Sequence, residues 1–282
     1  MKLKSKRYLL AMLPFVLLVL FYELLPILMI VVRSFRVEGQ MGFTLEHYIT
    51  IFSKKLYQKA VINSIFVAII SSAIGILIAF WGAKAANEVT SKWKNFFLNI
   101  LNMTSNFAGI PLAFAFMILL GNVGILVMLG KSLGITFLAE FNVYSVNGLL
   151  LTYIYFQVPL ATLLLIPTFH GLRKEWKEAV LLLGGNSGIY WRRVAIPVIM
   201  PSIAATLSVL FSNAIAAYAT AYALLANNYS LLPIRISEQF VGDLVQRKEF
   251  GSALAVVLML TMITATLINN YFIKKTRGGV SQ

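Results

Sequence analysis

Six long apolar runs, separated by shorter polar segments, dominate the hydrophobic pattern of this 282-residue chain. They cover residues 9–32, 61–83, 96–120, 148–168, 199–225 and 250–273. A bilayer core about 30 Å thick is crossed by roughly 20 consecutive apolar residues of helix, and each run reaches that length. We therefore predict an all-α membrane protein with six transmembrane helices, forming a single domain over residues 1–282.

The first run also has features of a signal peptide, because four basic residues precede it. It is longer than the apolar region of such a peptide. The sequence that follows it, Arg33-Ser34-Phe35-Arg36, is not a small-residue cleavage site. We therefore expect a retained membrane helix.

Composition and charge fit a membrane protein better than a soluble one. The chain is 59% hydrophobic and 12% charged, with a mean hydropathy of +0.82 and a net charge of +14, whereas soluble proteins average about 25% charged residues. The basic residues flank the apolar runs, which argues against nucleic-acid binding. The chain has no cysteine, which excludes disulfides and thiol catalysis, and His47 and His170 lie too far apart in sequence to indicate a metal site. We predict neither catalytic nor metal-binding residues.

The distribution of Lys and Arg predicts how the helices are oriented. With a cytoplasmic N-terminus, the inside segments hold 15 of the 24 basic residues and the longer outside segments hold 9. Positive charge is enriched in cytoplasmic loops, so we expect both termini inside. Residues 34–58 then form an external excursion. Residues 121–147 are also placed outside, with the short apolar piece 125–129 as a re-entrant or surface helix.

The connection between the fourth and fifth runs, residues 171–197, is long, basic and regular. Lys174–Leu183 is amphipathic and predicts a short helix, which Gly184 and the two residues after it end by accepting positive φ. A second short helix, basic at its end, leads to Pro197. Such a helix–turn–helix beside a membrane is suited to be held by a soluble partner, although surface-lying amphipathic segments without a partner are common.

Four parts of this connection occur at fixed separations. They are Glu178-Ala179-Val180, three residues, Gly184, nine residues, and Val194-Ala195-Ile196-Pro197. This arrangement resembles the signature of permease subunits of binding-protein-dependent ABC importers, which is Glu-Ala-Ala, three residues, Gly, nine residues and Ile-x-Leu-Pro. Leu183 departs from the family, which commonly has Asp there. A looser similarity extends over most of the chain and includes Thr44-Leu-Glu-His-Tyr48, Asn63-Ser64 and Gly109-Ile110-Pro111.

The resemblance, which is greatest to the polyamine, ferric-ion and phosphonate group, implies a permease in a bacterial inner membrane that forms the path of a small hydrophilic solute. It implies three kinds of partner: a second permease subunit, identical or homologous, two cytoplasmic ATPase subunits, and an extracytoplasmic solute-binding protein. The chain itself would be no enzyme and bind no cofactor, because ATP and Mg²⁺ belong to the ATPases. The resemblance maps ATPase coupling to Lys174, Lys177, Glu178, Ala179, Gly184 and Pro197.

One segment imitates a nucleotide-binding motif. Gly124, five residues, then Gly130-Lys131-Ser132 has one residue more than a phosphate-binding loop, and its interior is apolar. We therefore expect no ATP site in this chain.

Four asparagines in the third run, Asn95, Asn99, Asn102 and Asn106, follow at intervals of 4, 3 and 4 residues. At about 100° per residue they share one narrow stripe of a helix. Amides facing hydrocarbon are costly, so the stripe is expected to face protein or water. Asn102 and Asn106 are candidates for lining the path, with hydrogen bonds to neighbouring helices as the alternative. Just beyond, Gly109-Ile110-Pro111 predicts a helix break, because proline has no amide hydrogen.

Glu23 is the only acid well inside a predicted span. An ionised carboxylate there costs roughly 2.5–3.5 kcal/mol, so it is expected to face the interior, to be protonated or to have a partner. Two interpretations stay open. One is a cation-binding role on the path, and the other is a structural hydrogen bond near the outer end of the helix.

Further candidates for lining the path are Gln157, beside Pro159, and three residues of the fifth run, Asn213, Tyr218 and Thr220. No Lys or Arg lies deep in a span, which argues against an anion held by a buried base. The alternative function is a stand-alone secondary transporter or channel. Such proteins commonly show internal repeats and intramembrane charge, and neither is evident here.

Overall fold

The computed structural model describes residues 12–278 apart from 41, 90–91, 227 and 242–245. Within these residues the only β-structure is an isolated bridge between Arg36 and Phe43. The helices long and apolar enough to cross a membrane are Met12–Arg33, Lys55–Glu88, Ile110–Leu133, Val146–His170, Ser187–Ala216 and Lys248–Ile273. The prediction of an all-α protein with six such helices is therefore confirmed, although residues 9–11 of the first predicted span lie outside the described part.

The helix that starts at Met12 continues through a π turn, η1, into α2. The described elements are η1 (Leu20–Leu24), α2 (Leu25–Arg33), α3 (Glu46–Ser53), α4 (Lys55–Glu88), α5 (Lys92–Ser105), α6 (Ile110–Leu120), α7 (Ile125–Leu133), α8 (Thr136–Ala139), α9 (Val146–His170), α10 (Lys174–Leu182), α11 (Ser187–Tyr190), a second π turn η2 (Trp191–Ala195), α12 (Ile196–Ala216), α13 (Tyr218–Leu225), α14 (Leu232–Phe240) and α15 (Lys248–Gly278).

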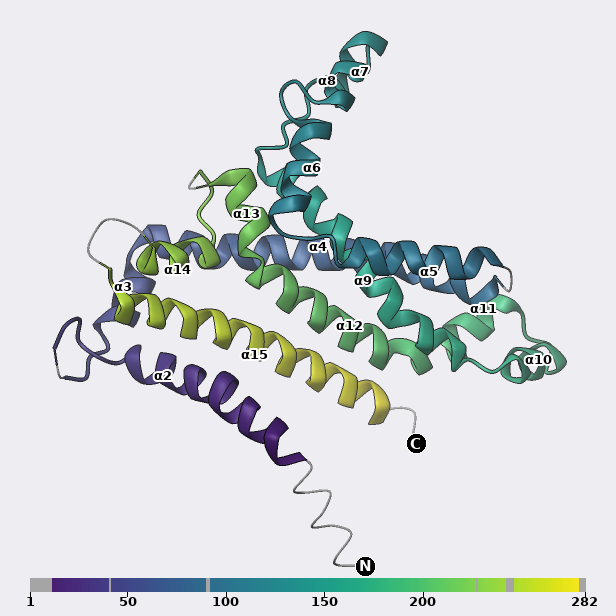
Figure 1. The fold of residues 1–282 in the computed structure, drawn as a ribbon. Helices are drawn as coiled ribbons and strands as arrows, with labels where there is room; N and C mark the ends of the chain where they lie inside the picture. The colour runs from purple at the N-terminus through teal and green to yellow at the C-terminus, as the bar shows by residue number, and fades with distance from the viewer. Residues whose placement is uncertain (1–11, 41, 90–91, 227, 242–245, 279–282) are drawn as a thin grey trace, which may run out of the picture.

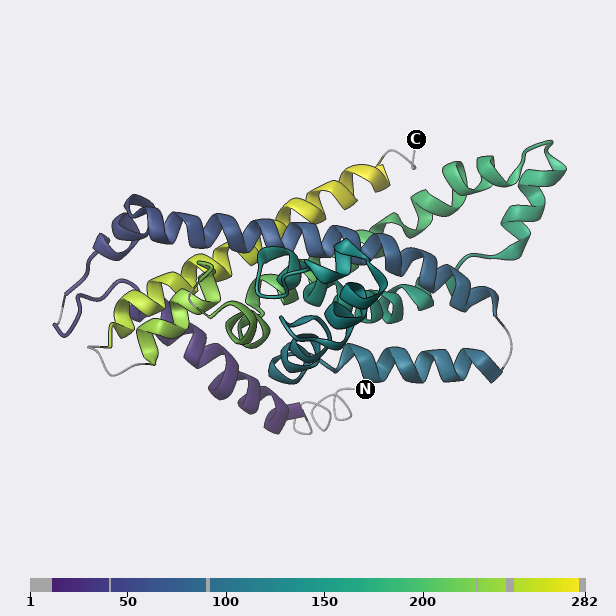
Figure 2. The same cartoon turned by 90° about the horizontal axis from the view of Figure 1, so that it is seen from above.

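Four long helices, α4, α9, α12 and α15, form the body of the molecule (Figures 1 and 2). α4 packs on α9 and α12, α12 packs on α15, and α2 lies along α15 at the edge. The end of α4, the start of α5, the pair α10–α11 and the end of α15 lie toward one end of the body, at the right of Figure 1. These are segments whose basic residues the sequence assigns to one side of the membrane.

Small side chains allow α4 to approach its neighbours closely. They recur at intervals of three or four residues along its buried face: Ala60, Ser64, Ala68, Ser71, Gly75, Ala79, Ala83 and Ala86. A Cβ atom on Gly75 would lie 3.2 Å from the Cβ of Gln157 on α9. Membrane helices associate through such small residues because lipid provides no hydrophobic force between them.

Both π turns precede a proline. η1 ends at Leu24, two residues before Pro26, and η2 ends at Ala195, two residues before Pro197. A proline inside a helix supplies no amide hydrogen, and its ring displaces the carbonyl of the preceding turn. A wider turn of the π type accommodates that displacement.

Two predicted spans are interrupted. The third, 96–120, consists of α5 and α6 with a break between them, and the apolar segment long enough to cross a membrane is 110–133. The physical reason is that α5 carries the polar asparagine stripe, whereas the residues after the break are nearly all apolar. The fifth, 199–225, breaks at Ala217 into α12 and α13. The break predicted at Gly109-Ile110-Pro111 is confirmed, since Gly109 has φ +74° and α6 begins at Ile110.

The segment α6–α8 forms an arm that projects away from the body (Figure 1). α7 packs on α6 and α8. A Cβ atom on Gly130 of α7 would lie 2.7 Å from the Cβ of Leu138, so glycine is needed for this close contact. The short helix expected at 125–129 is present as part of α7.

Candidate functional site

The turn after α10 depends on two glycines. The helix ends at Leu182, one residue before the predicted end. The Gly184 N–H donates to the Leu181 carbonyl (3.0 Å) and the Gly185 N–H donates to the Val180 carbonyl (2.9 Å), which is the Schellman pattern of a helix C-terminus. Gly184 has φ +79°, and a Cβ atom on Gly185 would lie 2.7 Å from Val180 Cγ1. Neither position accepts an ordinary side chain without strain.

The second half of the connection starts with its own cap. The Asn186 side-chain oxygen accepts a hydrogen bond from the Ile189 N–H (2.9 Å) at the start of α11, which satisfies one of the free amides of a helix N-terminus. Pro197 lies in the first turn of α12. Residues 171–197, which we call the coupling loop, are thus an ordered helix–turn–helix.

α10 presents most of its side chains to the outside. It packs mainly on α11, and it forms one extremity of the molecule in Figures 1 and 2. Leu182 and Leu183 are 88% and 87% exposed, and Glu178 makes no hydrogen bond or ion pair with any described residue. Lys174, Lys177 and Ala179 are exposed as well. The coupling loop therefore has an apolar tip with charged flanks.

An apolar groove lies between α10 and the start of α12. Its volume is about 330 Å³, and it is lined by Trp176, Ala179, Val180, Leu183, Val194 and Val198. The groove places Ala179, the small residue of the signature, beside the exposed leucine tip. A larger side chain at position 179 would reduce this space.

The break between α5 and α6 lies against the break between α12 and α13. The Thr220 hydroxyl donates to the Gly109 carbonyl (3.2 Å), and a Cβ atom on Gly109 would lie 3.8 Å from the Cβ of Ala219. Ala217 has ψ 92°, and its carbonyl accepts a hydrogen bond from the Tyr153 hydroxyl of α9 (2.6 Å). The Ala217 carbonyl is thus satisfied by a side chain of a neighbouring helix, whereas the Gly109 carbonyl accepts the Ala113 N–H of α6 (3.2 Å) and the Thr220 hydroxyl in addition. Irregular backbone without water nearby requires such partners.

The asparagine stripe of α5 faces away from the body. Asn95, Asn99, Asn102 and Asn106 are all exposed, whereas Leu101 on the opposite side of α5 is buried. The Asn102 amide donates to the Leu98 carbonyl (2.9 Å) and the Asn106 amide to the Asn102 carbonyl (2.8 Å). These hydrogen bonds stay within one helix, so the stripe of this chain does not link neighbouring helices. Asn213 on α12 is also exposed.

Gln157 lies in the contact between α9 and α4, not on an exposed surface that could line a solute path. Its side chain is 0% exposed, and its amide donates to the Ser71 hydroxyl of α4 (2.9 Å). Its carbonyl oxygen has no hydrogen-bond partner among the described residues. Gln157 therefore faces no open space in this chain, because the small residues of α4 bring the two helices close together there.

Glu23 lies in the π turn η1 and is exposed. It makes no hydrogen bond or ion pair with any described residue, so the structural hydrogen bond considered for it is not formed within the described chain. Glu23 lies 10 residues before Arg33, the last residue of its span, which places it about 15 Å from that end at 1.5 Å per residue. The carboxyl group is therefore near the middle of the span.

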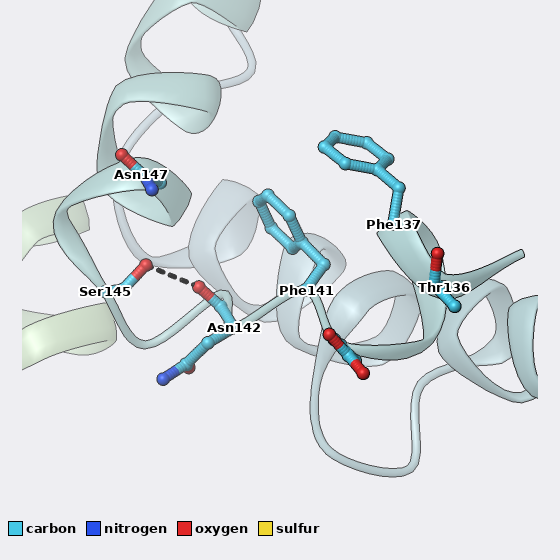
Figure 3. A pocket seen from close by; sticks show the side chains of 7 residues that line it. Thr136, Phe137, Phe141, Asn142, Ser145 and Asn147 are labelled. Carbon is cyan, nitrogen blue, oxygen red and sulfur yellow. Dashed lines mark hydrogen bonds between the residues drawn. The ribbon is translucent and has the colours of Figure 1, made fainter.

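A shallow cleft of about 520 Å³ lies on the arm, where α8 leads to α9 (Figure 3). Phe137 and Phe141 stand together on one side, with ring centres 6.1 Å apart. Asn142, Ser145 and Asn147 stand on the other, and the Ser145 hydroxyl donates to the Asn142 carbonyl (2.6 Å). No sequence motif marks this cleft, and the only expectation for it was that residues 121–147 lie on the outer side of the membrane.

Known proteins with related sequences are transport permeases. The chain is 26% identical over 262 residues to the trehalose transport system permease protein SugB of Mycobacterium tuberculosis, covering 89% of each chain. It is 22% identical to the spermidine/putrescine transport system permease protein PotC of Escherichia coli, covering 91% and 92%. A match to a probable sulfate transport system permease protein cysT of Chlorella vulgaris, 27% identical, covers 48% of this chain and spans only about half (51%) of that relative. No family model matches the chain.

The fold is also that of a solved importer. A crystal structure of a bacterial ABC transporter involved in the import of the acidic polysaccharide alginate superposes with a TM-score of 0.75, at 16% identity and with 97% of each chain covered. The chain is homologous to the permeases of ABC importers. As a permease it is a multi-pass membrane protein and a transporter, in agreement with the resemblance carried by the coupling loop.

Two features of the permease had no signal in its sequence. Ala217 stands among other alanines, with neither glycine nor proline beside it, so nothing marks it as a helix break. Tyr153 is one of 12 tyrosines, and only the structure shows that its hydroxyl meets the Ala217 carbonyl. Thr220 was noted as a wall candidate, but it is 2% exposed and bonded to Gly109.

Replacing Tyr153 by Phe should destabilise the permease, because the Ala217 carbonyl loses its donor in a buried place. We expect the free energy of unfolding to fall by about 1 kcal/mol, measured as a lower thermal midpoint of the purified protein in detergent. Tyr155→Phe is the matched control, since Tyr155 lies on the same helix and is 40% exposed. Equal shifts in the two variants would contradict the role given to the Tyr153 hydroxyl.

Proposed function

We propose that this chain is one of two permease subunits that form the path of an ATP-driven importer. ATPase subunits move the pair through the coupling loop, and an extracytoplasmic binding protein delivers the solute. The observation that carries the proposal is the ordered coupling loop, which combines the importer signature with an exposed apolar tip at Leu182 and Leu183.

The chemistry of the coupling loop fits a soluble partner. Residues 171–197 hold five basic and two acidic residues, so the matching surface of an ATPase would be acidic at its rim. Leu183 replaces the Asp common in the family, and its exposed side chain calls for an apolar centre in that surface. ATP and Mg²⁺ are then bound by the ATPases, and the permease contributes the coupling loop to which they bind.

The path is proposed to run along the exposed asparagine face of α5 and the paired helix breaks. Asn102, Asn106 and Asn213 offer amides there, and a second permease, identical or homologous, would close this face from the other side. α5 beyond Lys94, α12 and α13 contain no Lys or Arg. We therefore infer a small hydrophilic solute without net negative charge, which favours a polyamine over a phosphonate. Glu23, near the middle of its span, remains a candidate for contact with a cation.

The orientation follows from charge. The coupling loop and both termini are assigned to the cytoplasm, and residues 121–147, which form the far part of the arm and lead to α9, to the outside. The arm then carries the cleft of Figure 3 on the side where the binding protein arrives. One related solved structure is described as an alginate ABC transporter in complex with its alginate pentasaccharide-bound periplasmic protein, which supports a binding protein as partner of this chain.

A stand-alone secondary transporter or channel is the other class considered. It would need no coupling loop and would work in the absence of ATPase subunits. Reconstitution of the purified permease alone into vesicles separates the two, because only the stand-alone protein would move solute there.

Replacing Gly184 by Pro should uncouple transport. Proline requires a negative φ, whereas Gly184 has φ +79°, so the turn that shapes the coupling loop cannot form. We expect solute uptake to fall to background while the amount of permease in the membrane is unchanged. Uptake is measured in cells with a radiolabelled panel that includes spermidine, trehalose and sulfate, which also tests the charge of the solute.

Gly184→Asn is the control for that variant. Asparagine tolerates the left-handed conformation better than other side chains, and no atom lies within 4 Å of the position where its Cβ would be. It should keep most of the uptake. Full uptake by the proline variant would exclude a role of this turn in coupling.

Replacing asparagines of the stripe tests the path. Asn106 is the first residue after α5, in the break that leads to α6, and Asn95 lies near the start of α5, where a path would already open to water. We expect Asn106→Leu to reduce uptake several-fold more than Asn95→Leu, with equal amounts of protein in the membrane. Equal effects, or no effect, would place the path elsewhere.

A further inference from the structure

A cluster of aromatic rings joins the coupling loop to the body of the permease, with Trp191 at its centre. The Trp191 ring lies 6.2 Å from that of Phe80 on α4 and 6.4 Å from that of Phe169 on α9, measured between ring centres. Phe80 and Phe169 are themselves 5.3 Å apart. Three rings from three elements thus form a closed set, an arrangement worth more than the apolar area it buries.

The same tryptophan ring also makes a cation–π contact. The Lys84 ammonium lies 4.7 Å from the centre of the Trp191 ring and 5.2 Å from that of Trp81. Both distances are within the range of cation–π attraction. Lys84 is one turn after Phe80 on α4, so α4 contacts Trp191 through an aromatic ring and a charge.

Trp191 occupies the place where the coupling loop becomes a membrane helix. It is the first residue of η2, the π turn that precedes Pro197, and follows Tyr190, which is 6% exposed. α10 packs mainly on α11. A displacement of α10 therefore reaches the long helices through residues 171–173 to α9, through η2 into α12, and through the rings that Trp191 meets on α4 and α9. In the π turn the Ile196 N–H donates to the Trp191 carbonyl five residues earlier, and such a turn next to proline is a place where a helix can bend.

The two helices whose rings contact Trp191, α4 and α9, extend toward the place where the breaks at Gly109 and Ala217 meet. On α9, Tyr153 lies 16 residues before Phe169, which is about 24 Å along the helix. Tyr153 bonds the Ala217 carbonyl at the break between α12 and α13. α9 and α4 are tied together by the Gln157–Ser71 hydrogen bond. The packed pair of helices thus has Trp191 at one end and the paired helix breaks toward the other.

We infer that Trp191 is a positioning residue that transmits the movement of the coupling loop to α4 and α9. The inference rests on the proposed function, since it needs an ATPase that moves the loop. Its aromatic faces are required because both Phe80 and Phe169 meet the ring at steep angles, 66° and 52° between ring planes. A flexible aliphatic side chain would fill the space without fixing the relative angle of the three elements.

The test uses the permease reconstituted with its ATPase, partner permease and binding protein in liposomes. Solute uptake and ATP hydrolysis are measured together for Trp191→Leu and Trp191→Phe. We expect Trp191→Leu to retain the ATPase subunit and its hydrolysis, but to transport about tenfold less solute per ATP. Trp191→Phe keeps a ring and should restore most of the ratio. Trp93→Ala is the control, because Trp93 is 74% exposed and lies on α5, outside the cluster.

Three results would overturn the inference. The first is a normal ratio of uptake to hydrolysis in Trp191→Leu, which would make Trp191 mere packing. The second is an equal loss in Trp93→Ala. The third is an equal fall of uptake and hydrolysis in Trp191→Phe as well as Trp191→Leu, which is the result of a structural defect. Failure of the unmodified permease to bind an ATPase would instead refute the proposed function.

Discussion

The permease depends on satisfying its backbone polar groups where the helices leave regular geometry. Hydrocarbon supplies no hydrogen bonds, yet two helices break at Gly109 and Ala217. Thr220 and Tyr153 bond the carbonyls of these two residues. The breaks are therefore ordered parts of the fold, and the elements beyond them, α6 and α13, can leave the direction of the body.

Close packing gives the rest of the molecule its stiffness. The small side chains of α4 bring α9 near enough for Gly75 to meet Gln157, and the two helices form the most extensively packed pair of the described chain. The coupling loop, by contrast, is held mainly through α11 and the rings around Trp191. The coupling loop is thus joined to the body by the chain at both of its ends, to α9 and to α12, and by the rings around Trp191.

Much of this could be read from the sequence, because lipid imposes a simple rule of length and hydropathy. The six helices, the break at Gly109 and the turn at Gly184 all follow from local chemistry. The break at Ala217 does not, since alanine favours helix and only the distant Tyr153 stabilises the alternative. Gln157 looked like a wall residue because it is polar in an apolar span. Its burial follows from the small residues of α4, which let α9 approach closely. The sequence shows these small residues, but it does not show that α9 is the helix that packs on them.

The coupling loop is proposed to be the contact with an ATPase. The chain has no cysteine, so Leu182→Cys introduces a single reactive thiol at the 88% exposed tip, and Ser132→Cys on α7 is the matched position on the arm. A thiol-specific cross-linker is applied to intact membranes, and the products are identified by mass spectrometry. The account predicts that Leu182→Cys is joined to a nucleotide-binding subunit and Ser132→Cys is not. Labelling of Leu182→Cys by an impermeant reagent added outside intact cells, with no such product, would contradict it.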